Sequence, residues 1–446
     1  MQSKQQLNLF SFTMIVVGLV IGMGIFRTAA TSAKNAIDPS VYFTAWILGG
    51  FIALCGALTY AEIGSRMPVT GGFYKVFSYA YHPSIAFAVN CIILISNAAS
   101  VAGVAIIGSG YLTKLFPQYQ FSDTDNAIIS SIAVIAFYIV NLMGLKTSSI
   151  AQNVLMLVKI AMILVLIGCL FSTSDYATQT HHISNQITSQ STPKLSWIQS
   201  LGISLIAVSF TYGGYQQTIN FGNEVKHPTK NIPRGIFIGI AIIIALYLLV
   251  SLSYYLLIGF DNIKTEKEIA YVVMNKVFGQ AGANVFSFFL FIGVLAYVNA
   301  LLMSNPRVMF AMGEEGSLPK IFAKQHSKTN VLTVSLTVFA AICIIILFFA
   351  QTFEKILNFS IFLDCFGMIA SAGAVFILRK STKHLDSVDT YKMKVPFLTI
   401  LFMAAYLFVG ISITIQTPDT ALVGLAVLAA FIVIYFLFAK KKTETV

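Results

Sequence analysis

The feature that most constrains this chain is a series of long apolar stretches that are almost free of charged residues. A helix needs about 20 mostly apolar residues to cross a bilayer. The chain has 446 residues, of which 57% are hydrophobic and 10% are charged, whereas soluble globular domains carry about 25% charged residues. The pattern predicts an all-α membrane protein, because lipid leaves no water to satisfy an irregular backbone.

We expect a single transmembrane domain over residues 1–446, with twelve transmembrane helices. The first stretch is too long for the apolar core of a cleavable signal peptide. The expected spans are 9–33, 41–61, 85–113, 127–145, 150–171, 198–221, 235–259, 282–306, 329–350, 356–378, 395–416 and 420–439.

The distribution of basic residues predicts how the chain is oriented. With a cytoplasmic N-terminus, 19 of the 28 Lys and Arg residues lie on the inner side, eight lie on the outer side, and Lys159 lies inside a span. The positive-inside rule therefore places both termini in the cytoplasm of a protein in the cell membrane. The net charge of +11 is explained by topology rather than by nucleic-acid binding, since no soluble domain is large enough to carry a basic face.

Two spans are interrupted by glycine pairs. Gly22 and Gly24 lie in the first span, and Gly213 and Gly214 lie in the sixth. Each pair alone is equally consistent with close helix packing. The two spans are five crossings apart, however, and glycine-interrupted segments at matching positions of inverted repeats indicate a transporter binding site. We therefore predict repeats over about 9–171 and 198–378, with additional helices over about 395–439.

The two predicted breaks suggest a ligand. A half-helix that begins after the first break offers free N–H groups and the positive end of its dipole, which suit a carboxylate. A half-helix that ends at the second break offers free carbonyl groups, which suit an ammonium group. One site with both ends matches a zwitterion, so we predict a secondary transporter of α-amino acids.

Only two charged residues lie well inside the spans, Lys159 and Asp364. A charge at mid-membrane costs at least about 2.5 kcal/mol and usually marks a functional site. We expect Lys159 to gate or couple transport by binding unwound carbonyl groups near residues 18–22, with a purely structural pairing as the alternative. Asp364 is a candidate proton carrier, substrate contact or structural acceptor. With so few acidic partners we expect small or medium neutral side chains to be preferred, and transport of arginine would instead make Asp364 the recognition residue.

Other residue types argue against other functions. No zinc-binding spacing exists among the five cysteines, and all six histidines fall in loops or at helix ends, so no cofactor or metal is expected. An enzyme would need clustered catalytic groups at membrane depth, and a channel would need pore-lining repeats or charge rings. A polyamine or cationic amine carrier and a non-transporting amino acid sensor stay open. A subset of the charged residues in the inner connections is expected to form a gate of ion pairs, and the candidates are Glu62, Arg66, Glu224, Arg234, Arg307, Glu314 and Glu315.

Several motifs resemble those of the amino acid–polyamine–organocation superfamily, and within it the L-amino acid transporter group. Gly22-Met23-Gly24-Ile25-Phe26 is similar to the Gly-Ser/Thr-Gly-Ile-Phe motif of that group. The resemblance extends in order over spans 1 to 10. It includes Tyr60-Ala61-Glu62-Ile63-Gly64, Gly71-Gly72-Phe73-Tyr74, Gln152-Asn153-Val154 with Lys159, Phe210-Thr211-Tyr212-Gly213-Gly214-Tyr215, Asn223-Glu224-Val225, and Arg307 with Leu318-Pro319.

The resemblance implies a five-plus-five inverted repeat of the LeuT type, with helices 1 and 6 broken. It implies that backbone N–H groups around Gly22, Met23 and Gly24 hold the substrate carboxylate, and that carbonyl groups hold its amine. The carbonyl groups that the resemblance implies as acceptors are those of Ile21, Phe210, Thr211 and Gly213. The Phe210 ring would close the site from outside.

The resemblance also bears on coupling and selectivity. A lysine at the position of Lys159 stands in for a sodium ion, which implies a sodium-independent exchanger or a proton-coupled symporter. Two residues depart from the motifs: Met23 replaces Ser or Thr, and Tyr215 replaces Trp. Both departures leave the side-chain preference open. The sequence does not indicate the oligomeric state.

Overall fold

The computed structural model describes residues 7–22, 24–172, 196–266, 268–327, 329–349, 353–382 and 390–439. Within these ranges the chain is a bundle of helices, with only two isolated β-bridges. The helices of the first half are α1 (Leu9–Val20), α2 (Gly24–Asn35), α3 (Pro39–Arg66), α4 (Gly72–Ala80), α5 (Pro83–Thr113), α6 (Asp123–Leu142), α7 (Leu145–Gly168) and η1 (Cys169–Ser172). The second half contains α8 (Trp197–Tyr212), η3 (Tyr215–Asn220), η4 (Gly222–Glu224), α9 (Pro228–Ile258), α10 (Phe260–Thr265), α11 (Ile269–Glu314), η5 (Lys320–Ala323), α12 (Thr333–Phe349), α13 (Phe353–Ser381), α14 (Phe397–Gln416) and α15 (Pro418–Ala439).

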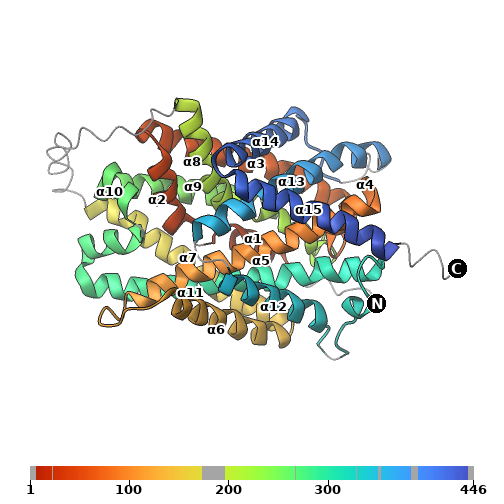
Figure 1. Cartoon of the computed structure of the whole chain (residues 1–446), viewed down its shortest axis with the longest axis horizontal. Coiled ribbons are helices and arrows are strands. Elements are labelled where there is room, and N and C mark those ends of the chain that lie inside the picture. The colour runs from red at the N-terminus through yellow and green to blue at the C-terminus, as the bar shows by residue number, and fades with distance from the viewer. Residues whose placement is uncertain are drawn as a thin grey trace.

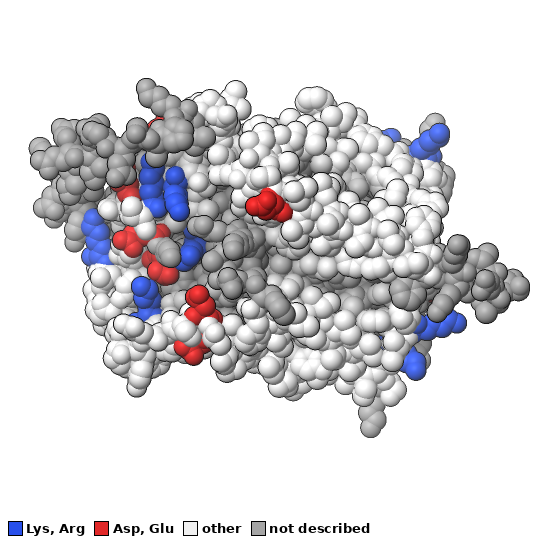
Figure 2. Space-filling view, in the orientation of Figure 1, with Lys and Arg blue, Asp and Glu red and all other residues white. Residues whose placement is uncertain are grey.

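The described part of the chain holds ten helices that are long and apolar enough to cross a membrane, so the protein is a multi-pass membrane protein. Two expected spans coincide with shorter helices: 198–221 with α8, of 16 residues, and 329–350 with α12, of 17 residues. Figure 2 shows charged side chains gathered at the two ends of the long axis, with a broad, almost uncharged band between them. Such a band suits contact with lipid tails.

The longest helices cross in the middle of the bundle. α5 packs against α11 and α13, and α11 also packs against α7 (Figure 1). α11 continues well beyond the expected span 282–306 at both ends, with a kink at Gly279, where φ is 70°. On one side of this centre, α3 packs against α9 and α2 packs against α8. These pairings hold the two interrupted segments inside the protein.

Both predicted interruptions occur in the structure. α1 ends at Val20, Ile21 leaves the helical region with ψ of 82°, and α2 begins at Gly24. α8 ends at Tyr212, after which Gly213 is extended and Gly214 has φ of 115°. The chain then continues as the 3₁₀ helices η3 and η4. Met23 lies outside the described residues.

Candidate functional site

The two interruptions lie directly against each other. A Cβ atom on Gly214 would collide with the carbonyl group of Leu19. A Cβ atom on Gly24 would lie 2.9 Å from Cγ2 and 3.1 Å from Cα of Thr211. The side chains of Thr28 and Thr211 share a hydrogen bond, which ties α2 to α8. The glycines therefore both permit close packing and mark the breaks, so the two interpretations of their sequence pattern are compatible.

The helix ends at these breaks have the polarity that the sequence predicts. α2 begins at Gly24, where the first N–H groups of a helix have no partner within it. α8 ends beside it, with the Phe210 carbonyl accepting a hydrogen bond of 3.3 Å from the Gly213 N–H group. A helix N-terminus attracts negative charge and a C-terminus attracts positive charge. The arrangement can therefore hold an anion and a cation close together.

A polar cavity opens beside the second break. Three of the predicted site residues line it: Phe210, Gly213 and Asp364. Its walls come from α5, α8 and the segment after it, α11, α13 and α14. The complete lining is Asn97, Ser100, Ser209, Phe210, Gly213, Gly214, Gln216, Tyr297, Leu301, Ile361, Asp364, Met368 and Tyr406.

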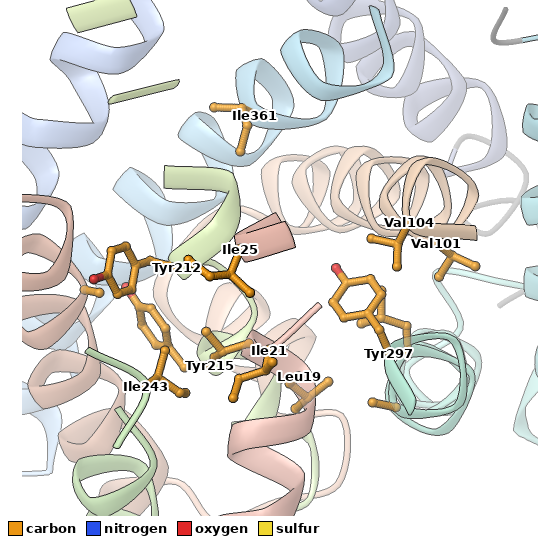
Figure 3. Close-up of a cluster of buried hydrophobic side chains, with 14 of the residues drawn as sticks. Leu19, Ile21, Ile25, Val101, Val104, Tyr212, Tyr215, Ile243, Tyr297 and Ile361 are labelled. Atoms are coloured by element: carbon orange, nitrogen blue, oxygen red, sulfur yellow. The ribbon is translucent and has the colours of Figure 1, made fainter. Parts of the chain in front are cut away.

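Tyr297 separates the first break from this cavity. Its ring lines the cavity, and its Cδ2 atom would be 3.3 Å from a Cβ atom on Gly22. Figure 3 shows this ring projecting from α11 toward the region of Ile21 and Ile25, which lie on either side of the first break. A rotation of one aromatic side chain would therefore change how much of the α1–α2 break is open to the cavity.

Lys159 lies at the first break. Its side chain is fully buried, and its ammonium group donates a hydrogen bond of 2.5 Å to the Ile21 carbonyl. The neighbouring Val20 carbonyl accepts a hydrogen bond of 3.1 Å from the Tyr247 hydroxyl. Lys159 therefore occupies a carbonyl group that the family resemblance offers to the substrate amine, and it joins α7 to the end of α1.

Asp364 lies on α13, and its Oδ1 atom accepts a hydrogen bond of 2.7 Å from the Ser96 hydroxyl on α5. The Ser96 hydroxyl also lies 3.0 Å from the Ser360 carbonyl. Both contacts cross the interface between α5 and α13. They orient the Asp364 side chain at the wall of the cavity.

The structure separates the predicted site residues into three groups. Phe210, Gly213 and Asp364 share the cavity, and Ile21 and Lys159 contact each other behind it. Gly24 and Thr211 lie where the two broken segments pack, and the Thr211 hydroxyl is occupied by Thr28 and by the Ala207 carbonyl, whereas Gly22 packs against Tyr297 of α11. Sequence reasoning missed other cavity residues, among them Asn97, Ser100, Gln216 and Tyr297. The spacing of Asn97 and Ser100 on one helix face was the available signal.

Ion pairs connect helices at the end of the bundle where α1 begins. Arg307 on α11 pairs with Glu224 through two contacts, Nε to Oε1 at 2.9 Å and Nη2 to Oε2 at 3.1 Å. The Leu7 N–H group donates a hydrogen bond to the Glu224 carbonyl, and the Leu7 carbonyl accepts a hydrogen bond from the Lys226 N–H group. These contacts fix the segment that follows η3, beneath the cavity residues Gly213 to Gln216.

A second charged cluster at this end surrounds Glu62. Its carboxylate accepts hydrogen bonds from Arg66, from two nitrogen atoms of Arg379, and from the Met393 N–H group. Lys75 on α4 forms a more exposed pair with Glu314, at 3.4 Å. Nearby, burial raises the pKa of Tyr74 on α4 to about 12, and its hydroxyl shares a hydrogen bond of 2.6 Å with Ser317. Tyr74 therefore stays neutral and joins α4 to the segment after α11.

At the opposite end, Arg27 on α2 and Lys114 after α5 both pair with Glu268, at 3.3 and 3.7 Å. The structure thus carries ion pairs at both ends of the bundle, with the cavity between them. Among the described residues no group of three or more His, Cys, Asp or Glu side chains is placed to hold a metal ion.

A helical bundle with two interrupted helices at an internal polar site has the features of a membrane transporter. The sequence model of the amino acid permease family matches residues 7–440, so the chain belongs to this family. This match confirms the resemblance that the motifs carry. Since the family and its relatives are membrane transporters, the protein is not an enzyme.

Similar proteins share nearly the whole chain. The serine/threonine exchanger SteT of Bacillus subtilis (strain 168) is 27% identical, covering 99% of this chain and 98% of the exchanger. The human large neutral amino acids transporter small subunit 2 is 23% identical, covering 97% of this chain and 80% of that protein. The human cystine/glutamate transporter is 24% identical, covering 98% of this chain and 86% of that protein.

Proposed function

We propose that this permease carries α-amino acids across the cytoplasmic membrane by alternating access, with the substrate held between the two helix breaks. One observation carries the proposal: the start of α2 and the end of α8 meet, and Thr28 bonds to Thr211 across them. A carboxylate is favoured at the first end and an ammonium at the second. The backbone around Gly22, Met23 and Gly24 would bind the carboxylate, and the carbonyl groups of Phe210, Thr211 and Gly213 would bind the amine.

The proposed architecture is twelve spans, of which the first ten form two inverted five-helix repeats. The helix contacts support this architecture. In an inverted repeat, each contact between two spans should have a counterpart between the two spans that lie five positions away in the chain order. α5 against α13 corresponds to α11 against α7, and α1 against α9 corresponds to α8 against α3. Both members of each correspondence are among the well-packed helix pairs. The repeats would comprise residues 9–171 and 198–378, with α14 and α15 as additional helices.

The proposed closed state has both sides of the cavity blocked. The Glu224–Arg307 pair would close the cytoplasmic side, where both termini would lie, and the Arg27–Glu268 pair would contribute to the outer side. The Phe210 ring lines the cavity and would cover the substrate from outside. Opening each side in turn would give alternating access.

Coupling is proposed to depend on Lys159. Its side-chain nitrogen contacts the Ile21 carbonyl, so a protonated Lys159 would supply at the first break the positive charge that a sodium ion would otherwise provide. A permanently charged Lys159 fits an exchanger, and a Lys159 that releases its proton fits a proton symporter. The names of the relatives include exchange of serine and threonine and transport of large neutral amino acids, which supports an amino acid substrate.

The test is uptake into proteoliposomes that contain the purified protein. A panel of labelled L-amino acids is supplied at two pH values, with and without sodium and with and without internal unlabelled amino acid. We expect saturable uptake that does not require sodium. Stimulation by internal substrate identifies an exchanger, and stimulation by external acid identifies a symporter. Binding of amino acids without any uptake would replace the transporter by a sensor on the same fold.

A further inference from the structure

The cavity beside the second break has an uneven charge. Of its lining residues only Asp364 carries an acidic side chain, and none is Lys or Arg. The C-terminal end of α8, near Phe210 and Gly213, also lies at the cavity, and the negative end of its helix dipole favours positive charge. Two features of one cavity therefore attract cations.

Asp364 has few partners for a carboxylate. An ionised carboxylate can accept about four hydrogen bonds. Within the described part of the chain, Asp364 receives one, from the Ser96 hydroxyl. That hydroxyl has a single proton, and it is shared with the Ser360 carbonyl at 3.0 Å. Asp364 is therefore held in position while most of its acceptor capacity is free.

Glu62 provides an internal comparison. It is a fully buried carboxylate on the long helix α3, whereas Asp364 is partly buried, and it accepts hydrogen bonds from two arginines and a backbone N–H group. The hydrogen-bond donors around Glu62 thus fill its acceptor capacity, and this carboxylate holds helices together. No ion pair involving Asp364 occurs in the described ranges, although a mid-membrane charge without a partner is energetically costly.

We propose that Asp364 is the recognition group for a cationic side chain, so that the substrate is an L-amino acid with a positively charged side chain, with lysine as the test case. The inference rests on the proposed function, since the α-carboxylate and α-amine would occupy the two helix breaks. The side-chain ammonium would then supply the positive charge that Asp364 lacks. Ser96 is a positioning residue that holds the Asp364 carboxylate toward the cavity.

This inference replaces the expectation of neutral side chains. That expectation rested on the scarcity of acidic groups at membrane depth, and it named Asp364 as the exception. The structure places the exception at the cavity wall together with Phe210 and Gly213. Free diamines satisfy the carboxylate equally well but leave the start of α2 without an anion, so the α-carboxylate should distinguish the amino acid from the amine.

The experiment compares L-lysine with L-norleucine, which lacks only the terminal amine, and with cadaverine, which lacks the α-carboxylate. These compounds and L-ornithine are tested as competitors of the uptake of labelled L-leucine into proteoliposomes. A hydrogen bond to a charged group contributes about 1.5–3 kcal/mol, which corresponds to about a tenfold or greater preference. We expect wild-type protein to prefer lysine over norleucine by that factor, and to bind cadaverine more weakly than lysine. This comparison needs no variant and so does not depend on folding.

The variant Asp364→Asn should remove the preference, so that lysine and norleucine compete equally, and Ser96→Ala should reduce the preference less. Asp419→Asn, at an exposed position at the start of α15, is the matched control. Equal competition by lysine and norleucine in wild type would overturn the inference, as would unchanged lysine transport by Asp364→Asn. Loss of pH dependence for every substrate in that variant would overturn it in favour of a proton site. Uptake of neutral amino acids tests the proposed function separately in each case.

Discussion

The ammonium group of Lys159 donates a hydrogen bond of 2.5 Å to the carbonyl oxygen of Ile21, joining α7 to the point where α1 ends. The bond links residues 138 positions apart in the chain. It supplies a hydrogen-bond donor at the break, because the last carbonyl groups of a helix have no partner within the helix. A cation at this point also opposes the negative end of the α1 dipole.

We predict that Lys159→Ala reduces transport by about tenfold or more, since a hydrogen bond involving a charged group contributes about 1.5–3 kcal/mol. The measurement is initial uptake in proteoliposomes at several pH values. The variant should still insert and elute as a folded protein, because surrounding packing is retained. Lys34→Ala, at an exposed position near the end of α2, is the control. A normal rate with unchanged pH dependence would leave Lys159 with a structural role only.

A second prediction concerns the end groups of the substrate. A methyl ester lacks the carboxylate charge that the start of α2 would bind, and an N-acetyl derivative lacks the ammonium that the end of α8 would bind. Each should compete at least about tenfold more weakly than the parent amino acid. Inhibition of uptake by increasing concentrations of each derivative gives the comparison. An ester that competes as well as the parent acid would remove the carboxylate half of the proposed site.

Glycines and isolated charges made much of this architecture predictable. Apolar stretches located the helices, and the pairs Gly22–Gly24 and Gly213–Gly214 located both interruptions. The expectation that Lys159 reaches carbonyl groups near residues 18–22 agrees with its bond to Ile21. These signals are local or rare, because an unpaired charge or a glycine pair is costly inside a membrane helix.

Contacts between distant segments were not predictable. The walls formed by Asn97, Ser100 and Tyr297 depend on which faces of α5 and α11 turn inward, and polar residues of these types also serve ordinary helix packing. The partners of Glu62 include Arg379, which is 317 residues away. Gly214, which precedes the 3₁₀ helix η3, packs against Leu19 of the first broken helix, and no pattern within one segment predicts this contact.

The third prediction concerns Glu62, the carboxylate that is paired with two arginines. Glu62→Ala removes the fully buried carboxylate that pairs with both Arg66 and Arg379, and removing one partner of a buried ion pair costs about 3–5 kcal/mol. We expect a clear fall in the thermal unfolding temperature in detergent. Glu314→Ala, which breaks the more exposed pair with Lys75, should change that temperature little. Equal effects of the two variants would show that enclosure of the Glu62 cluster does not contribute to stability.

The last prediction concerns the pair between Arg307 and Glu224. Two parallel hydrogen bonds of 2.9 and 3.1 Å connect α11 to the segment that follows the second break, and the Arg307 side chain also lies over the Phe221 ring, 4.6 Å from its centroid. Removing Arg307 leaves Glu224 without its counter-charge in a mostly buried setting, so the closed arrangement should lose stability relative to an open one. Arg307→Gln should therefore expose the cavity on that side.

A cysteine introduced at the cavity wall, Ser209→Cys, reports this exposure through its reaction with a membrane-impermeant thiol reagent. The five native cysteines are buried and free, and protein without the added cysteine gives their background. Reaction from the side on which α1 begins should increase several-fold in Arg307→Gln, since a charged hydrogen bond contributes about 1.5–3 kcal/mol. The matched control is Lys75→Gln, which breaks a more exposed pair at the same end and should leave the rate unchanged. If both variants react at the parent rate, the Arg307–Glu224 pair does not hold this side closed.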